Sequence, residues 1–352
     1  MQTEIKILSK EIEHEYQNLL DNSTSALFSH SLKFKNFLSS ILKNAKDKYL
    51  CLYINGELEA AVPIFIKGTG LGSVVNSLPY YGNHGGIIRK SQNIDSVGIS
   101  PLLLNAINDL CEEINALSCT LVESPFDSND YYQSFGANLY DERVCQVAHL
   151  PKVHEANSYD DTLLHSFHQK TRNIVRKSFK GEFTVRHDGK ESTLQTLHEI
   201  HTQNILAIEG KPKNWSAYKA IKENFVYDED YRVYYASKEG EVVAALLVFY
   251  FKETVEYFTP VIKKEYRSQQ PLSLLIFQAM RDAVLEKEMS RWNWGGTWMS
   301  QKGVYHFKSR WGSVDYPYKY HIKTFKNLNY LKSIGTEELL SEFQDFYIYP
   351  FN

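Results

Sequence analysis

The chain has 352 residues, of which 43% are hydrophobic and 23% charged, and its formal net charge is −3. This composition is typical of a globular protein of about two domains, and it excludes disordered and collagen-like chains. The longest apolar run, residues 242–251, is about half of what a membrane-spanning helix needs, so no integral membrane segment is predicted. The charged N-terminal stretch lacks a signal-peptide core and the four cysteines are scattered, so we expect a reduced, soluble, cytoplasmic protein.

Two basic stretches interrupt this mildly acidic chain. Residues 165–190 carry seven Lys or Arg against two acids, and residues 300–326 carry six against one, so each stretch has a net charge of +5. Local basic patches often bind phosphate-bearing ligands, although a solvated helix face is the commoner explanation. The negative charge of the whole chain argues against a general nucleic-acid binder, and no DNA partner is predicted.

The chain contains two copies of one predicted element order, and each copy begins with a hairpin. Residues 49–66 have the pattern strand, Asn55-Gly56 turn, strand. Residues 231–250 repeat this pattern with Glu239-Gly240 at the turn. An internal repeat of this kind predicts two structurally related halves.

Each hairpin is followed by a helix and a short strand. The helices are predicted to begin at Pro101 and Pro271, where proline costs no hydrogen bond because the first N–H groups of a helix are unpaired. The strands are predicted at residues 119–123 and 291–294. Hairpin, helix and strand, twice over, indicate two α+β halves, and the chain has neither GxGxxG nor GxxxxGK[ST], the usual nucleotide-binding loops.

A polar connector, residues 151–158, separates the halves. Two helices are predicted after it, near residues 160–179 and 191–208. The first has an apolar stripe on one side and a basic face that includes Arg172 and Arg176 on the other.

Other patterns that could carry chemistry are weak. His198 and His201 form H-E-x-H, one residue short of the zinc-binding H-E-x-x-H spacing. None of the four cysteines has a histidine at a recognisable catalytic spacing. We therefore predict neither a metal site nor a cysteine nucleophile.

Five segments occur in an order that is similar to a known family: residues 171–178, 210–215, 241–257, 294–297 and 307–312. In that order they resemble the Fem family and its GNAT-fold acyltransferase relatives. The best-known members transfer amino acids from aminoacyl-tRNA to peptidoglycan precursors, and other relatives act on envelope polysaccharides. The resemblance spans roughly residues 25–325.

The resemblance implies an α+β fold, a tandem GNAT-like double domain of two mixed sheets flanked by helices. It places the N-terminal half at residues 1–150 and the C-terminal half at residues 151–326. It also implies that residues 327–352 pack back on the first half.

The resemblance implies a catalytic role for Lys308. This residue matches the lysine of the family's Phe-Lys pair, which stabilises the oxyanion of the tetrahedral intermediate and contacts the ester end of the donor. Phe307 and Trp311 flank it and are expected to line the substrate site and hold the lysine. A surface lysine is the alternative. No general base is identifiable, because Glu123 and Asp315 stand near predicted strand ends without diagnostic spacing, and the family favours a substrate-assisted route.

Further substrate-binding residues follow from the same resemblance. A glycine-rich loop is similar to the one that lines the family's acceptor groove, and Tyr80, Tyr81 and His84 are its candidate ligands, with a tight structural turn as the alternative. The family places a phosphate-binding lysine near residues 33–35, and Lys35 is expected to be that lysine. Lys213 stands where the family places a basic phosphate contact. For both lysines a solvated surface cation is the alternative.

The donor is expected to be acyl-CoA or aminoacyl-tRNA. Arg172 and Arg176 are the candidate cofactor-binding residues that would face its nucleotide or tRNA backbone, and a solvated surface cation is the alternative for each. Residues 266–273 lack the glycines with which ordinary GNAT proteins hold the CoA pyrophosphate, and the chain has no room for the coiled-coil arm of typical peptidoglycan-bridge enzymes.

We therefore expect an N-acyltransferase that acts on an amine of a cell-envelope glycan or peptidoglycan precursor and uses no metal. The alternative is a non-catalytic double-GNAT protein that binds a glycan precursor or a partner. The sequence leaves the choice of donor, the acceptor and the oligomeric state open.

Overall fold

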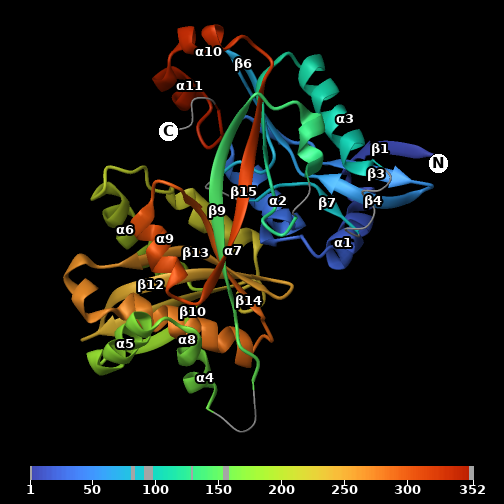
Figure 1. The fold of residues 1–352 in the computed structure, drawn as a ribbon. Coiled ribbons are helices and arrows are strands. Elements are labelled where there is room, and N and C mark those ends of the chain that lie inside the picture. Colours follow the sequence, from blue (N-terminus) through green and yellow to red (C-terminus); the bar gives the residue numbers. More distant parts are fainter. Residues whose placement is uncertain (1, 81–83, 91–97, 128–129, 154–157, 349–352) are drawn as a thin grey trace. The chain divides into compact units, whose positions relative to one another are not determined.

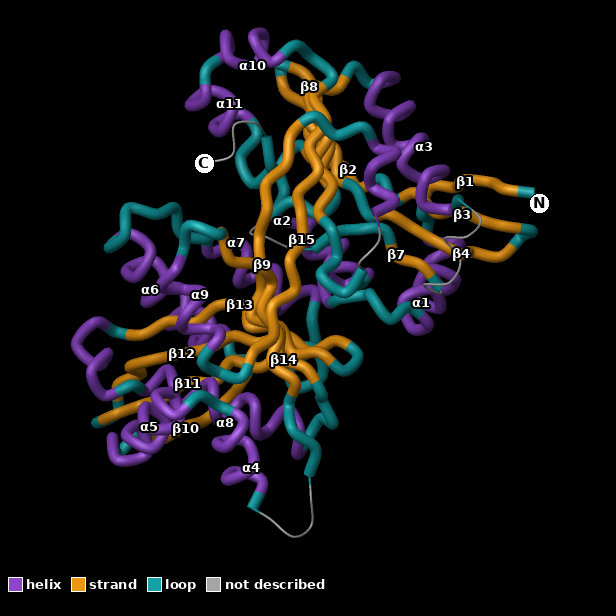
Figure 2. The backbone as a smooth tube through the Cα atoms, viewed as in Figure 1, coloured by secondary structure: helices purple, strands orange, loops and turns teal. Residues whose placement is uncertain are grey.

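The computed structural model describes residues 2–80, 84–90, 98–127, 130–153 and 158–348 (Figures 1 and 2). The chain divides into unit 1, residues 1–144 and 316–352, and unit 2, residues 145–315. Two long strands, β9 (Leu139–His149) and β15 (Ser313–Thr324), contain the limits of these units. Within the described ranges, no helix is long and apolar enough to cross a membrane.

Unit 1 combines two sets of strands with a buried helix. Its other elements are β1 (Thr3–Ile7), α1 (Glu13–Asn22), α2 (Leu32–Ile41), β2 (Ala45–Asp47), β3 (Leu50–Ile54), β4 (Glu57–Val62), β5 (Phe65–Thr69), β6 (Gly72–Asn76), β7 (Ile88–Arg89), α3 (Ile99–Glu113), β8 (Ala116–Val122), α10 (Leu328–Ile334) and α11 (Thr336–Glu342). Strands β1, β3, β4 and β7 pair antiparallel in that order. Strand β8 pairs antiparallel with β15 and parallel with β6, which continues to β5 and β2. Helix α3 fills the core of unit 1 with Leu103, Leu104 and Ile107, all fully buried.

The C-terminal segment of the chain packs on strands of unit 1. The side chain of Asn76, at the end of β6, donates to the backbone oxygen of Tyr347 at 3.0 Å and accepts from its N–H at 2.6 Å. The Nζ of Lys67 donates to the backbone oxygen of Gln344 at 3.1 Å. Residues 344–347 therefore lie against β5 and β6.

Unit 2 is a sheet with helices on both faces. Its elements are α4 (Tyr159–Ser166), α5 (Gln169–Ser178), β10 (Thr184–Asp188), α6 (Glu191–Leu206), α7 (Trp215–Asn224), β11 (Tyr231–Lys238), β12 (Glu241–Phe251), β13 (Thr254–Ile262), α8 (Pro271–Leu285), β14 (Arg291–Trp298) and α9 (Lys302–Ser309). The strands lie in the order β10-β11-β12-β13-β14. Helices α5 and α8 cover one face and α6 covers the other (Figure 1). The main core of unit 2 lies under α8, whose Leu275 and Met280 pack with Trp292 and Trp294 of β14.

The two predicted hairpins are confirmed, and both turn in the same way. Asn55 (φ 51°) and Gly56 (φ 89°) join β3 to β4, and Glu239 (φ 53°) and Gly240 (φ 84°) join β11 to β12. Two consecutive positive φ angles define the type I′ turn, whose twist matches that of the flanking strands.

The two predicted proline-started helices differ in detail. Pro271 is the first residue of α8, as predicted, whereas α3 begins at Ile99, two residues before Pro101. Pro101 still lies in the first helical turn, where a missing N–H breaks no helical hydrogen bond.

The helix predicted over residues 160–179 is in fact two helices, α4 and α5. Between them Phe167 (ψ 154°) and His168 (ψ 145°) have extended backbones. The ring of Phe167 packs edge-on against Trp311, with 4.9 Å between ring centroids, and the N–H of His168 donates to the backbone oxygen of Arg310 at 2.9 Å. Contacts with a segment far away in the sequence thus override the helical periodicity.

Gly312 lies so close to the break between α4 and α5 that a side chain at this position should destabilise the fold. Its φ is +76°, and a Cβ on it would lie 2.5 Å from the backbone oxygen of Ser166. We expect Gly312→Ala to lower the free energy of unfolding by about 1–3 kcal/mol, because both the overlap and the left-handed backbone add strain. The matched variant Gly303→Ala has no atom within 4 Å of its Cβ. It should be neutral or gain up to about 1 kcal/mol. Urea unfolding compares the two variants, and equal losses would contradict the prediction.

Candidate active site

The neighbouring strands β13 and β14 pair over only part of their length. Their parallel ladder covers three residue pairs and ends where Glu256 faces Asn293. Beyond that pair β13 continues to Ile262 and β14 to Trp298. The register of β13 against β12 also shifts, which leaves Phe258 as an extra residue and bends the strand. The facing edges of both strands therefore carry backbone N–H and C=O groups that no β13–β14 ladder uses.

Lys308 on α9 is buried beside this point, with 6% of its surface exposed. Its Nζ donates to the backbone oxygens of Gly295 at 3.2 Å and Gly296 at 3.1 Å, and to Oγ1 of Thr297 at 2.8 Å. A lysine ammonium has three donors, so all three are directed at protein oxygens. Burial lowers the pKa of Lys308 to about 8. The site thus holds a fixed cation that loses its proton close to neutral pH.

Glu256 supplies a carboxyl group to the same site. Burial raises its pKa to about 7, against the opposing effects of a hydrogen bond to Asn293 and the charge of Arg291. The thiol of Cys145 donates to Oδ1 of Asn293 at 3.1 Å, and burial raises its pKa well above the usual range, so it stays protonated. The charges of Glu256 and Lys308 act on this thiol in opposite directions. These four residues, Glu256, Asn293, Cys145 and Lys308, are called the Lys308 cluster below.

Aromatic rings hold α9 in place. Phe307 packs edge-on against Trp294 of β14, with 5.8 Å between ring centroids, and lies 6.2 Å from Trp311. Trp294 and Trp311 are themselves 5.7 Å apart. Trp311 is buried, so it anchors α9 to the core, whereas Phe307 is 38% exposed and can also contact a ligand.

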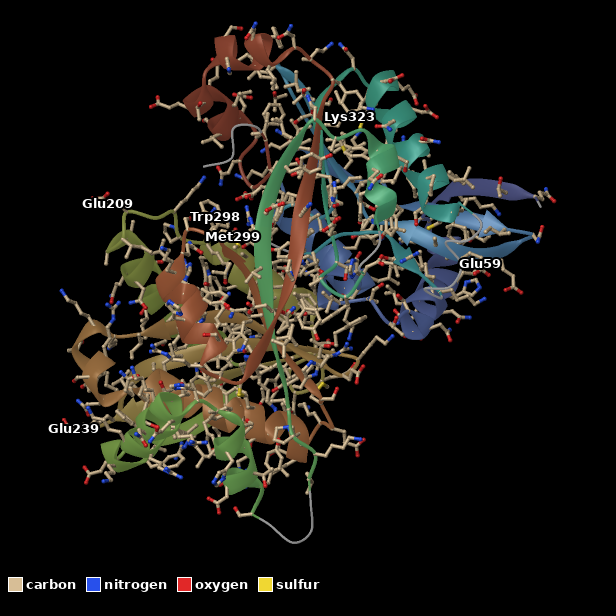
Figure 3. The ribbon with its side chains drawn as sticks, in the orientation of Figure 1. Glu59, Glu209, Glu239, Trp298, Met299 and Lys323 are labelled. Atoms are coloured by element: carbon tan, nitrogen blue, oxygen red, sulfur yellow. The ribbon has the colours of Figure 1, made fainter. Side chains whose placement is uncertain are left out.

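The Lys308 cluster lies just inside the surface of unit 2. The two residues that follow Thr297 are exposed, Trp298 by 38% and Met299 by 68% (Figure 3). Because Thr297 is buried and bonded to Lys308, the residue next to one that contacts the cluster is already exposed.

Lys213 is held next to β13 by the two histidines of the H-E-x-H sequence. The backbone N–H of Lys213 donates to Nε2 of His201 at 3.2 Å, and its backbone oxygen lies 3.2 Å from Nε2 of His198, which donates to it. The side chain then reaches Oγ1 of Thr259 at 3.2 Å and lies over the ring of Phe258. Burial lowers the pKa of Lys213 to about 8. Among the residues that the structure describes, no group of three or more His, Cys, Asp or Glu could hold a metal ion.

His201 makes the stability of the chain sensitive to acid. Burial lowers its pKa to about 4, helped by the charge of Lys213. Between the ordinary value near 6.5 and pH 4 the unfolded chain binds a proton that the folded chain does not, so stability is complete above 6.5 and falls as pH falls to 4. We expect His201→Gln to reduce this loss by about 3 kcal/mol, since glutamine can accept the same N–H. Urea unfolding at pH 6.5 and at pH 4 measures the loss in the free energy of unfolding. The control is His306→Gln, because His306 is exposed and this variant should lose as much stability as the wild type.

Three of the predicted substrate ligands lie in the described part of unit 1. The ammonium of Lys35 already pairs with two carboxylates, at 3.1 and 4.0 Å. Tyr80 is buried with a φ of 81°. His84 is also buried, and its Nδ1 lies 3.2 Å from the backbone oxygen of Glu123. Tyr81 lies outside the described residues.

The two predicted donor-binding arginines lie on α5. Arg172 is half-buried and donates to the backbone oxygen of His165 at 3.2 Å, whereas Arg176 is exposed. Lys308, Phe307, Trp311 and Lys213 therefore lie around β13, β14 and α9, and the arginines belong to the helices of the α8 face.

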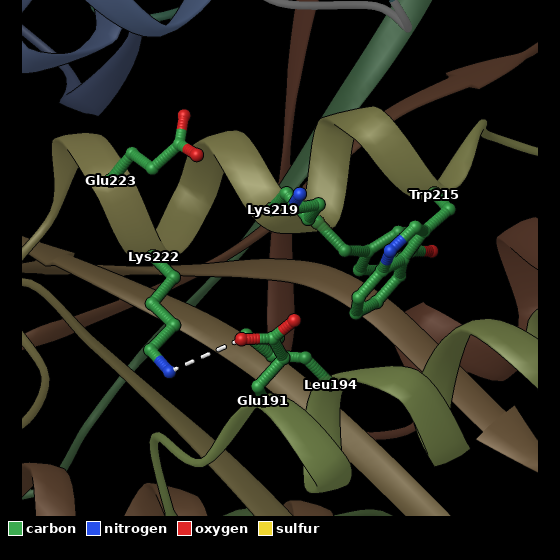
Figure 4. A pocket seen from close by; sticks show the side chains of 7 residues that line it. Glu191, Leu194, Trp215, Lys219, Lys222 and Glu223 are labelled. Carbon is green, nitrogen blue, oxygen red and sulfur yellow. Dashed lines mark ion pairs between the residues drawn. The ribbon is translucent and has the colours of Figure 1, made fainter.

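A separate pocket of about 300 Å³ lies between α6 and α7 (Figure 4). Its lining residues are Glu191, Leu194, Trp215, Tyr218, Lys219, Lys222 and Glu223. Lys222 and Glu191 pair across it at 3.6 Å. None of these residues belongs to the Lys308 cluster.

Sequence reasoning missed Glu256, Asn293 and Thr297. The available signal was polar side chains within otherwise apolar strands: a single acid in TVEYFTPVI and a single amide in WNW. A buried charge is costly unless it is paired or functional, so such positions are candidates for a site.

Comparison with known proteins relates this geometry to a fold family. Residues 165–309 match the acetyltransferase (GNAT) domain family. FemX is similar to the chain with a TM-score of 0.68 at 12% identity, covering 90% of this chain and 96% of FemX. A tandem GNAT protein from the clavulanic acid biosynthesis pathway gives 0.55 at 11% identity, covering 93% and 99%. L-PGS from Bacillus licheniformis gives 0.54 at 12% identity, covering 92% and 96%. No curated protein sequence matches the chain.

These similarities confirm the predicted α+β fold of mixed sheets flanked by helices. They extend over nearly the whole chain, whereas the domain match is confined to the segment that contains β13, β14 and Lys308. The chain therefore has the fold of FemX and of the tandem GNAT protein, and its residues 165–309 match the acetyltransferase (GNAT) domain family.

Proposed function

We propose that the chain is an N-acyltransferase that transfers an acyl or aminoacyl group to an amine of a cell-envelope glycan or peptidoglycan precursor. The observation that carries the proposal is that Glu256, with a pKa near 7, and Lys308, with a pKa near 8, both act on the Cys145 thiol where β13 and β14 part. Two groups whose pKa values are shifted toward neutrality from opposite directions are typical of acid–base catalysis.

In the proposed reaction Glu256 acts as the base. Its carboxylate takes a proton from the acceptor ammonium, and the neutral amine then attacks the carbonyl carbon of the donor. The negative charge that develops on the carbonyl oxygen is stabilised by the Lys308 ammonium. Lys308 exchanges its longest bond, to Gly295, for this oxyanion, because a charge-assisted hydrogen bond is stronger than one to a neutral carbonyl. Collapse of the intermediate expels the CoA sulfur or the tRNA oxygen, which takes up the proton that the attacking nitrogen loses, and Glu256 releases its own proton to solvent.

The strand edges beyond Glu256 bear on the choice of donor. Backbone N–H and C=O groups that lie outside a strand ladder can bind an extended ligand that has amides of its own, as in strand addition. The pantetheine arm of acyl-CoA has two such amides, so this feature favours acyl-CoA. The exposed cations of α5, among them Arg176 and Lys177, favour the tRNA backbone instead.

All three hydrogen-bond donors of the Lys308 ammonium are used within the protein, and this supports a second candidate function. An ammonium whose three donors are all used by protein oxygens can also be a structural clamp on the end of β14. In that case the chain is a double-GNAT protein that binds a glycan precursor without catalysis.

Donor binding tests the proposal without knowledge of the acceptor. A ligand at about 100 times its Kd should stabilise the chain by ~2.7 kcal/mol, which a thermal shift detects. We expect stabilisation by acetyl-CoA, or by a charged tRNA pool if the donor is aminoacyl-tRNA. Uncharged tRNA and free CoA serve as controls for the acyl group. If neither acetyl-CoA nor charged tRNA shifts the melting temperature, the proposed acyltransferase function is contradicted. The non-catalytic binding function is then preferred.

A further inference from the structure

Strand β1 is the free edge of a sheet in unit 1. In the described part of the chain it pairs with β3 alone (Figures 1 and 2). All five of its residues are exposed. Within the described ranges, no strand pairs with its other edge. A free edge presents a row of backbone donors and acceptors that another strand can use.

The backbone groups on that edge can be identified. The backbone oxygen of Gln2 accepts from Asn55 at 2.9 Å, and the N–H of Leu8 donates to Tyr49 at 2.9 Å, so residues 2 and 8 face β3. Backbone direction alternates along a strand, which directs residues 4 and 6 toward β3 as well. Thr3, Ile5 and Ile7 therefore direct their N–H and C=O groups outward.

The side chains of the same residues extend an apolar surface to the edge. Ile5 faces Leu52 and Ile7 faces Leu50 across the β1–β3 pair. Both leucines are buried in the core cluster of unit 1, whereas Ile5 is 38% and Ile7 51% exposed. The apolar face of the sheet is thus buried at β3 but continues onto β1, where it is exposed.

The charges on the opposite face are self-complementary. Glu4 and Lys6 lie on either side of Ile5, and their side chains pair with each other at 3.3 Å in the single chain. An antiparallel second copy of this strand, centred on Ile5, would place Glu4 opposite the second copy's Lys6 and Lys6 opposite the second copy's Glu4.

We infer that β1 pairs antiparallel with β1 of a second copy of the chain, in the register centred on Ile5. In this register Thr3 faces the second copy's Ile7 and Ile5 faces the second copy's Ile5. Each of these pairs brings two outward backbones together and exchanges two hydrogen bonds. The exposed isoleucines of both copies meet on one face and two ion pairs form on the other.

Other registers are disfavoured by the same residues. A register centred on Lys6 places the two Lys6 side chains opposite each other, and one centred on Glu4 does the same with the carboxylates. A shift by one residue places residues whose N–H and C=O groups point outward opposite residues whose groups point toward β3. The hydrogen bonds of the ladder then cannot form. The pairing has two-fold symmetry and closes as a dimer.

Two charge-reversal variants of β1 test the inference. Sedimentation velocity over a concentration series measures the Kd of the dimer. The wild-type chain should dimerise with rising concentration. Glu4→Lys and Lys6→Glu should each raise the dimer Kd about tenfold, because each replaces two attractive pairs with two repulsive ones. An equimolar mixture of the two variants should restore dimerisation, since one presents only cations and the other only anions.

A backbone variant tests the ladder itself. Ile5→Pro removes an outward N–H and leaves the bonds between β1 and β3 intact, so it should abolish the dimer while the circular dichroism spectrum stays unchanged. At concentrations where the wild-type chain is monomeric, the two melting temperatures should agree. A wild-type chain that stays monomeric up to its solubility limit would overturn the inference. So would a dimer that none of the three variants weakens.

Discussion

Replacement of Lys308 with alanine is expected to lower kcat and kcat/KM together, by roughly 10²–10³-fold. An equal loss in both constants marks an interaction that forms only in the transition state, as the oxyanion contact does. Donor binding, measured by thermal shift, should remain. The free energy of unfolding should fall by about 1–3 kcal/mol, because the oxygens of Gly295, Gly296 and Thr297 lose their common donor.

The matched control for this variant is Lys302→Ala. Lys302 is also on α9 but is exposed, so its removal leaves the site intact and activity should stay near that of the wild type. If Lys308→Ala keeps its kcat and loses only stability, the lysine is a structural clamp and the non-catalytic function is preferred.

Replacement of Glu256 with glutamine should have the second large effect, a fall in kcat/KM of roughly 10²–10⁴-fold. The pH profile gives a sharper readout. The wild-type rate should rise with pH through about 7, as Glu256 loses its proton and becomes able to accept one. It should fall above about 8, as Lys308 loses its charge. The maximum therefore lies between the two values.

Glu256→Gln should remove the rise near pH 7 and keep the fall near pH 8. Glu253→Gln is the control, because Glu253 precedes β13, is largely exposed, and bonds Arg291 at 2.8 Å and Ser290 at 2.7 Å, neither of which belongs to the Lys308 cluster. A profile that keeps its acidic limb after Glu256→Gln would show that another group is the base.

The parts of the fold that follow from local chemistry could be predicted from the sequence. Asn55-Gly56 and Glu239-Gly240 fix two hairpins through their own backbone preferences, and Pro271 fixes the start of a helix. The break at Phe167 could not be predicted, since its cause is contact with Trp311, far away in the chain. Local periodicity carries no information about such a partner.

The candidate site divides in the same way. Lys308 is recognisable because it belongs to a short ordered pattern that resembles a known family. Glu256 has no such pattern, and its role depends on being the last residue before β13 and β14 part. Its pKa depends on burial, which only the packed structure supplies. Residues whose importance comes from where a ladder ends are therefore missed by sequence reasoning.

The contact between the α4–α5 break and the end of α9 determines which segments of unit 2 open together. The amide of His168 is bonded to Arg310, two residues beyond Lys308, and Phe167 packs on the next residue, Trp311. We therefore expect loosening of α9 to release the first turn of the basic helix α5 as well. In amide hydrogen exchange, His168 should share the opening rate of the α9 amides, so the helix that carries the candidate catalytic lysine and the helix that carries the cations form one cooperative segment.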